Sequence, residues 1–236
     1  MIDESKYIFR RATIDDIDFV VDVIVNAEKG GTEKFGFANL FGISEQEARR
    51  LLNEMLEEEI DGCEFSISSY IIAEYEGVHV SAFAGWIEGE NEDSMPSSLL
   101  KSNLIAYYLP KACLENSMAR ADAVKDLQIE RELGTYQLEY SYTVPEHRGH
   151  GLVGKIIEEH CRVARQGGKE VSRMYVHTFA NNEPAVAVYK KSGFREMQKF
   201  VSPLVISFKR AITFSLFLCM SSVSIFFAFA DLNFLT

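Results

Sequence analysis

The sequence lacks the cysteine and histidine patterns that mark disulfide-stabilised or metal-binding proteins. Its four cysteines are scattered along the chain and include no CxxC pair, so neither a disulfide framework nor a zinc site is predicted. The five histidines also lack the spacing of metal ligands, and we expect no metal cofactor. Free thiols are typical of a reducing compartment, which predicts a cytoplasmic protein.

An excess of basic residues is also missing. The 236 residues include 24 Lys and Arg against 35 Asp and Glu, which gives a formal net charge of -11. Because phosphate contacts need clustered Lys and Arg, this charge disfavours a nucleic-acid partner. An acidic surface attracts cationic amines, although an acidic solvated face that binds nothing explains the same balance.

A glycine-rich turn between a strand and a helix is the main feature that the sequence does contain. Residues 135–144 are dense in Tyr, Thr and Val, as strands are, and apolar residues recur at helical spacing from Ile156 to Ala164. Gly149 and Gly151 allow the backbone to approach a ligand, and the unpaired amides of the first helical turn favour an anion. The turn therefore predicts a pyrophosphate site.

The two commonest nucleotide-binding units do not fit this turn. A Walker motif needs Ser or Thr after its lysine, whereas Lys155 is followed by Ile156, so no hydroxyl is available for a magnesium nucleotide. A dinucleotide-binding fold opens with such a unit and continues through further βαβ repeats, but this turn lies beyond the middle of the chain.

Two motifs resemble those of the GCN5-related N-acetyltransferase (GNAT) family. The run from Arg148 to Val153 is similar to the signature Arg/Gln-x-x-Gly-x-Gly/Ala, whose backbone amides hold the pyrophosphate of coenzyme A in that family. The last position departs from the pattern, because Val153 replaces Gly or Ala and Gly154 follows it. A second family motif is matched downstream by Asn182, Ala185, Tyr189, Gly193 and Phe194.

The resemblance implies an α/β (α+β) fold of the GNAT acyltransferase type, with a central mixed, mostly antiparallel sheet flanked by helices. The order of elements before the glycine turn agrees with this fold. We expect a loop through Gly36 and Gly42 between the first two helices. The expected elements are a strand over Tyr7–Thr13, a helix after Asp15 that ends at Gly30, a helix from Glu45 to about Ile60, and hairpin strands over Ser69–Glu76 and Val78–Glu88.

Residues 1–205 are predicted to form the acetyltransferase domain. A helical insertion of about 90–133 precedes the fourth strand, where the family normally has a short connection. Long insertions often act as lids or binding elements, so it either covers the acceptor site or serves packing or homodimer formation.

Residues 206–236 form a hydrophobic C-terminal tail. Within it, residues 211–230 carry no charge, follow Lys209 and Arg210, and are long enough to span a bilayer as a helix. The alternative is a strand and helix packed on the domain, since the family's closing strand is expected after Ser202. The sequence thus leaves a membrane anchor and a packed extension open.

The function implied by the resemblance is N-acetyl transfer from acetyl-CoA, the co-substrate, directly to a primary amine in a ternary complex. The acceptor amine belongs to a small molecule or a peptide, and the acidic composition favours a cationic one. A non-catalytic acyl-CoA-binding module for sensing or interaction is the alternative.

The resemblance also implies roles for individual residues. Glu139 is the candidate base and Tyr189 the candidate acid, while a backbone amide near Val144 would stabilise charge on the thioester oxygen. Glu139 is alternatively an outward-facing strand carboxylate, with Tyr140 and Tyr142 on the opposite face of the strand. The cofactor-binding candidates are Tyr142, Thr143, Val144, Arg148, Gly149, His150, Gly151, Leu152, Val153, Gly154, Asn182 and Tyr189.

Overall fold

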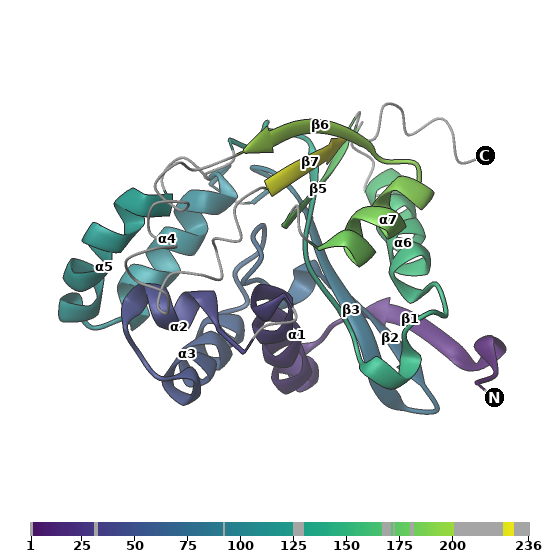
Figure 1. Ribbon diagram of the computed structural model, residues 1–236, viewed down its shortest axis with the longest axis horizontal. Helices are drawn as coiled ribbons and strands as arrows, with labels where there is room; N and C mark the ends of the chain where they lie inside the picture. Colours follow the sequence, from purple (N-terminus) through teal and green to yellow (C-terminus); the bar gives the residue numbers. More distant parts are fainter. Residues whose placement is uncertain are drawn as a thin grey trace.

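A seven-stranded sheet forms the centre of the computed structural model, which describes residues 2–30, 33–91, 93–124, 130–166, 171, 173–179, 182–200 and 224–228 (Figure 1). The strand order is β1-β2-β3-β4-β5-β7-β6. Only the β4–β5 pair is parallel among the strand pairs of the described residues, so the expected mixed, mostly antiparallel sheet is confirmed. The strands are β1 (Tyr7–Arg11), β2 (Tyr70–Tyr75), β3 (Val78–Ile87), β4 (Tyr136–Thr143), β5 (Met174–Phe179), β6 (Arg195–Phe200) and β7 (Ser224–Ala228).

Helices cover both faces of the sheet, and each face has its own hydrophobic core (Figure 1). The first core joins the sheet to α1 (Ile17–Lys29), α2 (Gly36–Phe41), α3 (Glu45–Glu57), α4 (Ser97–Tyr108) and the loops around them. The second core joins it to α6 (Leu152–Gln166) and α7 (Glu183–Lys191). Because α4 and α5 (Lys111–Val124) lie between β3 and β4, the expected helical insertion is confirmed.

The first two long helices begin where the sequence predicts, and α1 also ends there, whereas α3 ends at Glu57 instead of near Ile60. Gly30 ends α1 with a left-handed φ of 54°, and the Ser44 side chain accepts a hydrogen bond from the Glu47 amide at the start of α3. The loop expected through Gly36 and Gly42 is wrong, because residues 36–41 form α2. A helix this short has no periodicity to detect, and its buried Phe37 and Phe41 side chains stabilise it through tertiary packing.

A β-bulge interrupts β4 at Tyr140. Phe83 on β3 lies opposite Ser141 and Ala84 lies opposite Glu139, so Tyr140 is an extra residue, and its φ of 56° is left-handed. Strict alternation along the strand predicts that Glu139 and Tyr140 face opposite sides of the sheet. This prediction is wrong because of the bulge. Both side chains reach the core under α1 and α4, because the extra residue resets the alternation.

The bulge coincides with the point at which β4 and β5 separate. Their parallel pairing covers only Tyr136–Leu138 on β4, although the strand continues to Thr143. Those three residues are buried, whereas Glu139 to Thr143 are only partly buried in a strand at the middle of the sheet. Within the described parts of the chain, the second half of β4 therefore has no partner strand on the side that β5 leaves.

Part of the C-terminal tail contributes to the sheet. Ser224–Ala228 form β7, which pairs antiparallel with β5 and β6 and supplies a closing strand. Residues 201–223 and 229–236 lie outside the described residues. In the part of the chain that is described, no helix combines the length and apolar character needed to cross a membrane. A helical anchor over the whole of 211–230 conflicts with β7, and the remainder of that segment lies outside the described residues.

A histidine joins the second core to the sheet. His160 on α6 is buried, with Nε2 3.0 Å from the carbonyl oxygen of Phe83 and Nδ1 2.9 Å from the hydroxyl of Tyr136. A neutral imidazole satisfies both contacts, because Nε2–H donates to the carbonyl and Nδ1 accepts from the phenol. Burial lowers the pKa of His160 to about 4.

We expect this histidine to make the fold sensitive to acid. Since its folded-state pKa of about 4 lies below the ordinary 6.5, its contribution should be lost as pH falls through this window, by about 3 kcal/mol in total. Urea unfolding of wild type and His160→Gln at several pH values measures the effect. The stability difference between the two proteins should shrink toward low pH, and a constant difference would contradict the assignment.

Candidate functional site

The glycine turn after β4 provides an open cradle of backbone amides. Gly149 and Gly151 have left-handed φ angles of 84° and 71°, and a Cβ built on either would meet no atom within 4 Å. The first hydrogen bond of α6 runs from the Lys155 amide to the Gly151 carbonyl at 3.1 Å. The amides of residues 152–154 therefore precede the first helical bond and can donate to an anion at the helix N-terminus.

Val153, the departure from the family pattern, fits this turn without filling the cradle. Its side chain is partly buried and packs against the core under α6 and α7. The packing at Gly154 does not require a glycine, because a Cβ there would lie 3.8 Å from Ser192 Oγ, an ordinary contact distance. The β-branched side chain thus points into the protein, and only its amide belongs to the cradle.

Side chains around the turn hold its shape. The Nε of Arg148 donates to the Thr143 carbonyl at 3.0 Å, and its guanidinium lies 5.8 Å from the centre of the Tyr142 ring. His150 Nδ1 and Lys155 Nζ lie 3.4 Å and 3.1 Å from the carboxylate of Glu4. The N-terminal residues are thereby tied to the turn, and a cofactor role for His150 stays a prediction.

Among the described residues, no strand pairs with the second half of β4 on the β5 side. Val144 N donates to Val80 O at 2.9 Å, so this amide is engaged with β3. Because antiparallel strands alternate the direction of their backbone groups, the amides of Ser141 and Thr143 point away from β3, to the side that β5 leaves. The backbone donor expected near Val144 is therefore better supplied by Thr143.

Tyr189 lies on α7 beside this same half of β4. It is 3% exposed, its ring stacks on Phe83 with centroids 6.1 Å apart, and it forms a side-chain hydrogen bond with Ser141. Burial raises the pKa of Tyr189, so the phenol keeps its proton at neutral pH. Asn182, also a cofactor candidate, caps α7 by accepting from the Ala185 amide at 3.3 Å.

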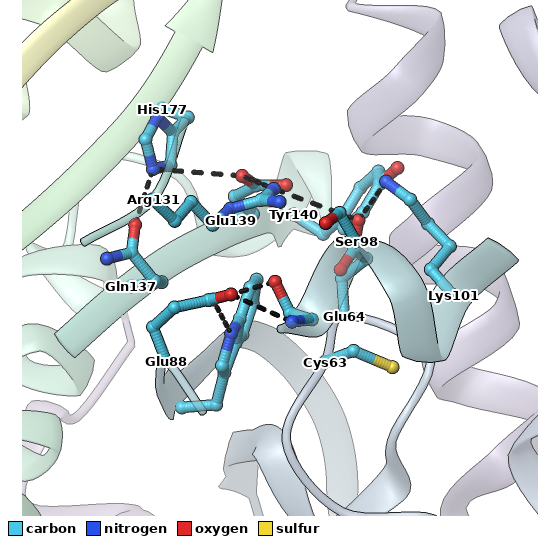
Figure 2. Close-up of polar contacts among 12 residues, drawn as sticks. Cys63, Glu64, Glu88, Ser98, Lys101, Arg131, Gln137, Glu139, Tyr140 and His177 are labelled. Carbon is cyan, nitrogen blue, oxygen red and sulfur yellow. Dashed lines mark hydrogen bonds and ion pairs between the residues drawn. The ribbon is translucent and has the colours of Figure 1, made fainter. Parts of the chain in front are cut away.

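A cluster of charged side chains lies on the other face of β4 (Figure 2). Glu139 pairs with Arg131, whose Nη2 is also 3.9 Å from Glu64, and Glu64 pairs with Lys101. His177 on β5 lies 3.8 Å from Glu139. Lys101 and Arg131 both belong to the insertion, so the insertion is joined to the sheet by ion pairs beside the bulge.

The cluster changes the interpretation of Glu139. Its carboxylate is occupied by the guanidinium of Arg131, which is itself nearly buried. No sequence pattern points to Glu64, Lys101 or Arg131, because these residues lie far apart along the chain and in irregular or inserted segments. Only the folded chain brings them beside β4.

Comparisons with known proteins agree with this geometry. A family model described as "Acetyltransferase (GNAT) family" matches residues 44–194. No curated protein sequence matches the chain.

Three solved structures have a similar fold. An N-acetyltransferase from Staphylococcus aureus Mu50 is 13% identical, with 94% of this chain and 99% of that chain covered and a TM-score of 0.63. The protein yncA of Salmonella typhimurium, solved with its cofactor acetyl-CoA, is 12% identical over 96% and 95% of the two chains, with a TM-score of 0.52. An agmatine N-acetyltransferase is 12% identical over 94% and 98%, also at 0.52. At such low sequence identities, the structural similarity establishes the fold alone.

The ion pair between Arg131 and Glu139 gives a stability prediction. Arg131→Met would leave a partly buried carboxylate without its cation, and we expect a loss of about 3–5 kcal/mol in the free energy of unfolding. The double variant with Glu139→Leu should lose less, since it removes both charges. Denaturant titration measures the losses.

Arg173 is a matched control, because its ion pair with Glu132 is exposed, with side-chain exposures of 51% and 54%. Arg173→Met should cost much less than Arg131→Met. Equal losses for the two single variants would contradict a buried pair at Glu139.

Proposed function

The chain belongs to the GNAT acetyltransferase family, with acetyl-CoA as co-substrate, and we propose that it transfers the acetyl group directly to a primary amine in a ternary complex. The observation that carries the proposal is the separation of β4 from β5 at the bulge, followed at the end of β4 by the amide cradle. This arrangement suits a ligand that has a pyrophosphate at one end and an amide-containing arm leading to the reacting group.

The residues fit coenzyme A along this line. The pyrophosphate would be held by the amides from Gly149 to Gly154, where the glycines leave open space. The amide groups of the pantetheine arm would pair with the free edge of β4 at Ser141 and Thr143. The reacting end of the arm would then lie beside the bulge.

A direct transfer agrees with the state of the buried thiols. Burial raises the pKa of Cys63 and of Cys161 to about 11, so neither is an activated nucleophile that could carry the acetyl group. Bound acetyl-CoA supplies the activated thioester. The Thr143 amide would stabilise the charge that develops on the thioester oxygen, and Tyr189 would donate its proton to the departing thiolate.

The acceptor is proposed to be cationic before it reacts. The net charge of -11 attracts ammonium groups, and carboxylates gather beside the bulge on the face opposite Tyr189. Small amines and the lysine side chains of peptides share this chemistry. An acyl-CoA-binding module without catalysis remains the second candidate, because the sequence-predicted base Glu139 is held by Arg131.

Release of free thiol from acetyl-CoA tests the function. The protein should release CoA thiol with at least one member of a panel that contains agmatine, putrescine, spermidine and a lysine peptide. Mass spectrometry should show one added acetyl group on that amine. Acetyl-CoA binding without thiol release for every amine would favour the module.

Replacing Tyr189 by Phe tests the proposed acid. The variant keeps the ring that stacks on Phe83 but loses the proton donor, so we expect kcat to fall roughly 100-fold while acetyl-CoA affinity stays within a few fold. Steady-state kinetics and calorimetric titration measure the two quantities. Tyr107→Phe, at a tyrosine that is 80% exposed, is the control and should change neither. An unchanged kcat in Tyr189→Phe would remove this residue as acid.

A further inference from the structure

Three carboxylates lie near the bulge, but the described cations pair with only two of them. Lys101 pairs with Glu64 and Arg131 pairs with Glu139. Glu28, near the end of α1, forms no ion pair with any Lys or Arg in the described parts of the chain. An incoming ammonium would therefore find Glu28 as the carboxylate whose charge is not already neutralised by direct contact.

Glu28 is fixed in place by two neutral hydrogen bonds. The hydroxyl of Tyr140 donates to Oε1 at 3.0 Å, and the backbone amide of Phe37 on α2 donates to Oε2 at 2.8 Å. A carboxylate oxygen can accept two hydrogen bonds, so each oxygen keeps the capacity for one more. Glu28 as a whole residue is partly buried.

The bulge places this carboxylate across β4 from the proposed acid. Tyr140, the extra residue of the bulge, reaches the first core and Glu28, whereas the next residue, Ser141, bonds Tyr189 at the second core. The two consecutive residues thus connect opposite faces of the strand. An acceptor that enters from the α1 face would meet Glu28, and a thiolate would leave toward Tyr189.

We propose that Glu28 accepts the proton of the acceptor ammonium and that Tyr140 is its positioning residue. The inference rests on the proposed acetyl transfer. The proton passes from nitrogen to a Glu28 oxygen, and the electron pair of the broken N–H bond stays on nitrogen. That pair forms the N–C bond as the C–S bond breaks, and the thiolate takes a proton from Tyr189. The nitrogen then loses its second proton, which restores Tyr189 through solvent, and Glu28 returns its own proton to solvent.

The surroundings of Glu28 suit a base better than those of Glu139. Burial raises the pKa of Glu28, and the negative charge of Glu64 acts in the same direction. The Phe37 amide, the Tyr140 hydroxyl and the charge of Lys101 oppose this rise without cancelling it. A carboxylate whose pKa is moved toward neutrality is a stronger proton acceptor than one paired with a guanidinium.

The test compares Glu28→Gln, Glu28→Asp, Tyr140→Phe and Glu139→Gln with wild type, using the best amine of the panel. We expect Glu28→Gln to lower kcat/KM roughly 100-fold with acetyl-CoA affinity unchanged, and Glu28→Asp to retain more activity. Hydroxylamine, which is largely unprotonated at neutral pH, should be acetylated by Glu28→Gln almost as fast as by wild type. Glu139→Gln compares the other candidate base, and its ratio of hydroxylamine to amine activity should equal that of wild type.

Tyr140→Phe separates a positioning role from a purely structural one, because a structural defect alone would not shift the pH dependence of kcat/KM. The Tyr140 hydrogen bond lowers the pKa of Glu28, so its removal should shift the acidic limb of the kcat/KM profile to higher pH. Thermal unfolding of each variant checks that the fold is intact.

The outcomes distinguish failure of the role of Glu28 from failure of the proposed acetyl transfer. An active wild type whose Glu28→Gln variant is equally active, or whose acidic limb does not move in Tyr140→Phe, overturns the role of Glu28 and leaves the proposed function standing. A wild type that binds acetyl-CoA and acetylates no amine overturns both. Loss of activity in Glu139→Gln alone would assign the base to Glu139.

Discussion

The extra residue at Tyr140 is the constraint on which the site depends. A β-strand at the middle of a sheet normally has neighbours on both sides along its length, but β4 pairs with β5 only up to Leu138. The bulge at Tyr140 follows shortly after this last pair. Tyr140 adopts a left-handed conformation there, which a bulky side chain rarely does. In the described structure, the end of β5 pairing, the partly buried second half of β4 and the contacts of consecutive residues on opposite faces all occur at this one irregularity.

The ion pairs of the insertion are the second constraint. Carboxylates beside the bulge would be costly to bury alone, and Lys101 and Arg131 neutralise two of them from a segment that lies outside the sheet. The insertion is therefore more than a packing element, since it sets the charge of the site. Glu28, in contrast to Glu64 and Glu139, is held by the neutral donors Tyr140 and Phe37, as its proposed role as base requires.

Local chemistry made most of the fold predictable. Residues such as Gly30 and Ser44 end and begin helices through backbone and capping preferences that operate over a few residues, and the β-rich runs of β2 to β5 were evident from composition. The cradle was also predictable, because the glycines and the start of α6 are adjacent in sequence. The bulge was not, since alternation along β4 shows nothing of the partner strand. The partners of Glu139 and Glu28 were hidden for the same reason: they come from distant segments, and only tertiary packing brings them together.

A crystal structure of the protein with coenzyme A tests the central claim most directly. We expect the pyrophosphate on the amides from Gly149 to Gly154, the pantetheine arm along the edge of β4 at Ser141 and Thr143, and the sulfur between Tyr189 on one face and Tyr140 on the other. A structure in which β4 and β5 pair along their full length, with coenzyme A bound elsewhere, would contradict it.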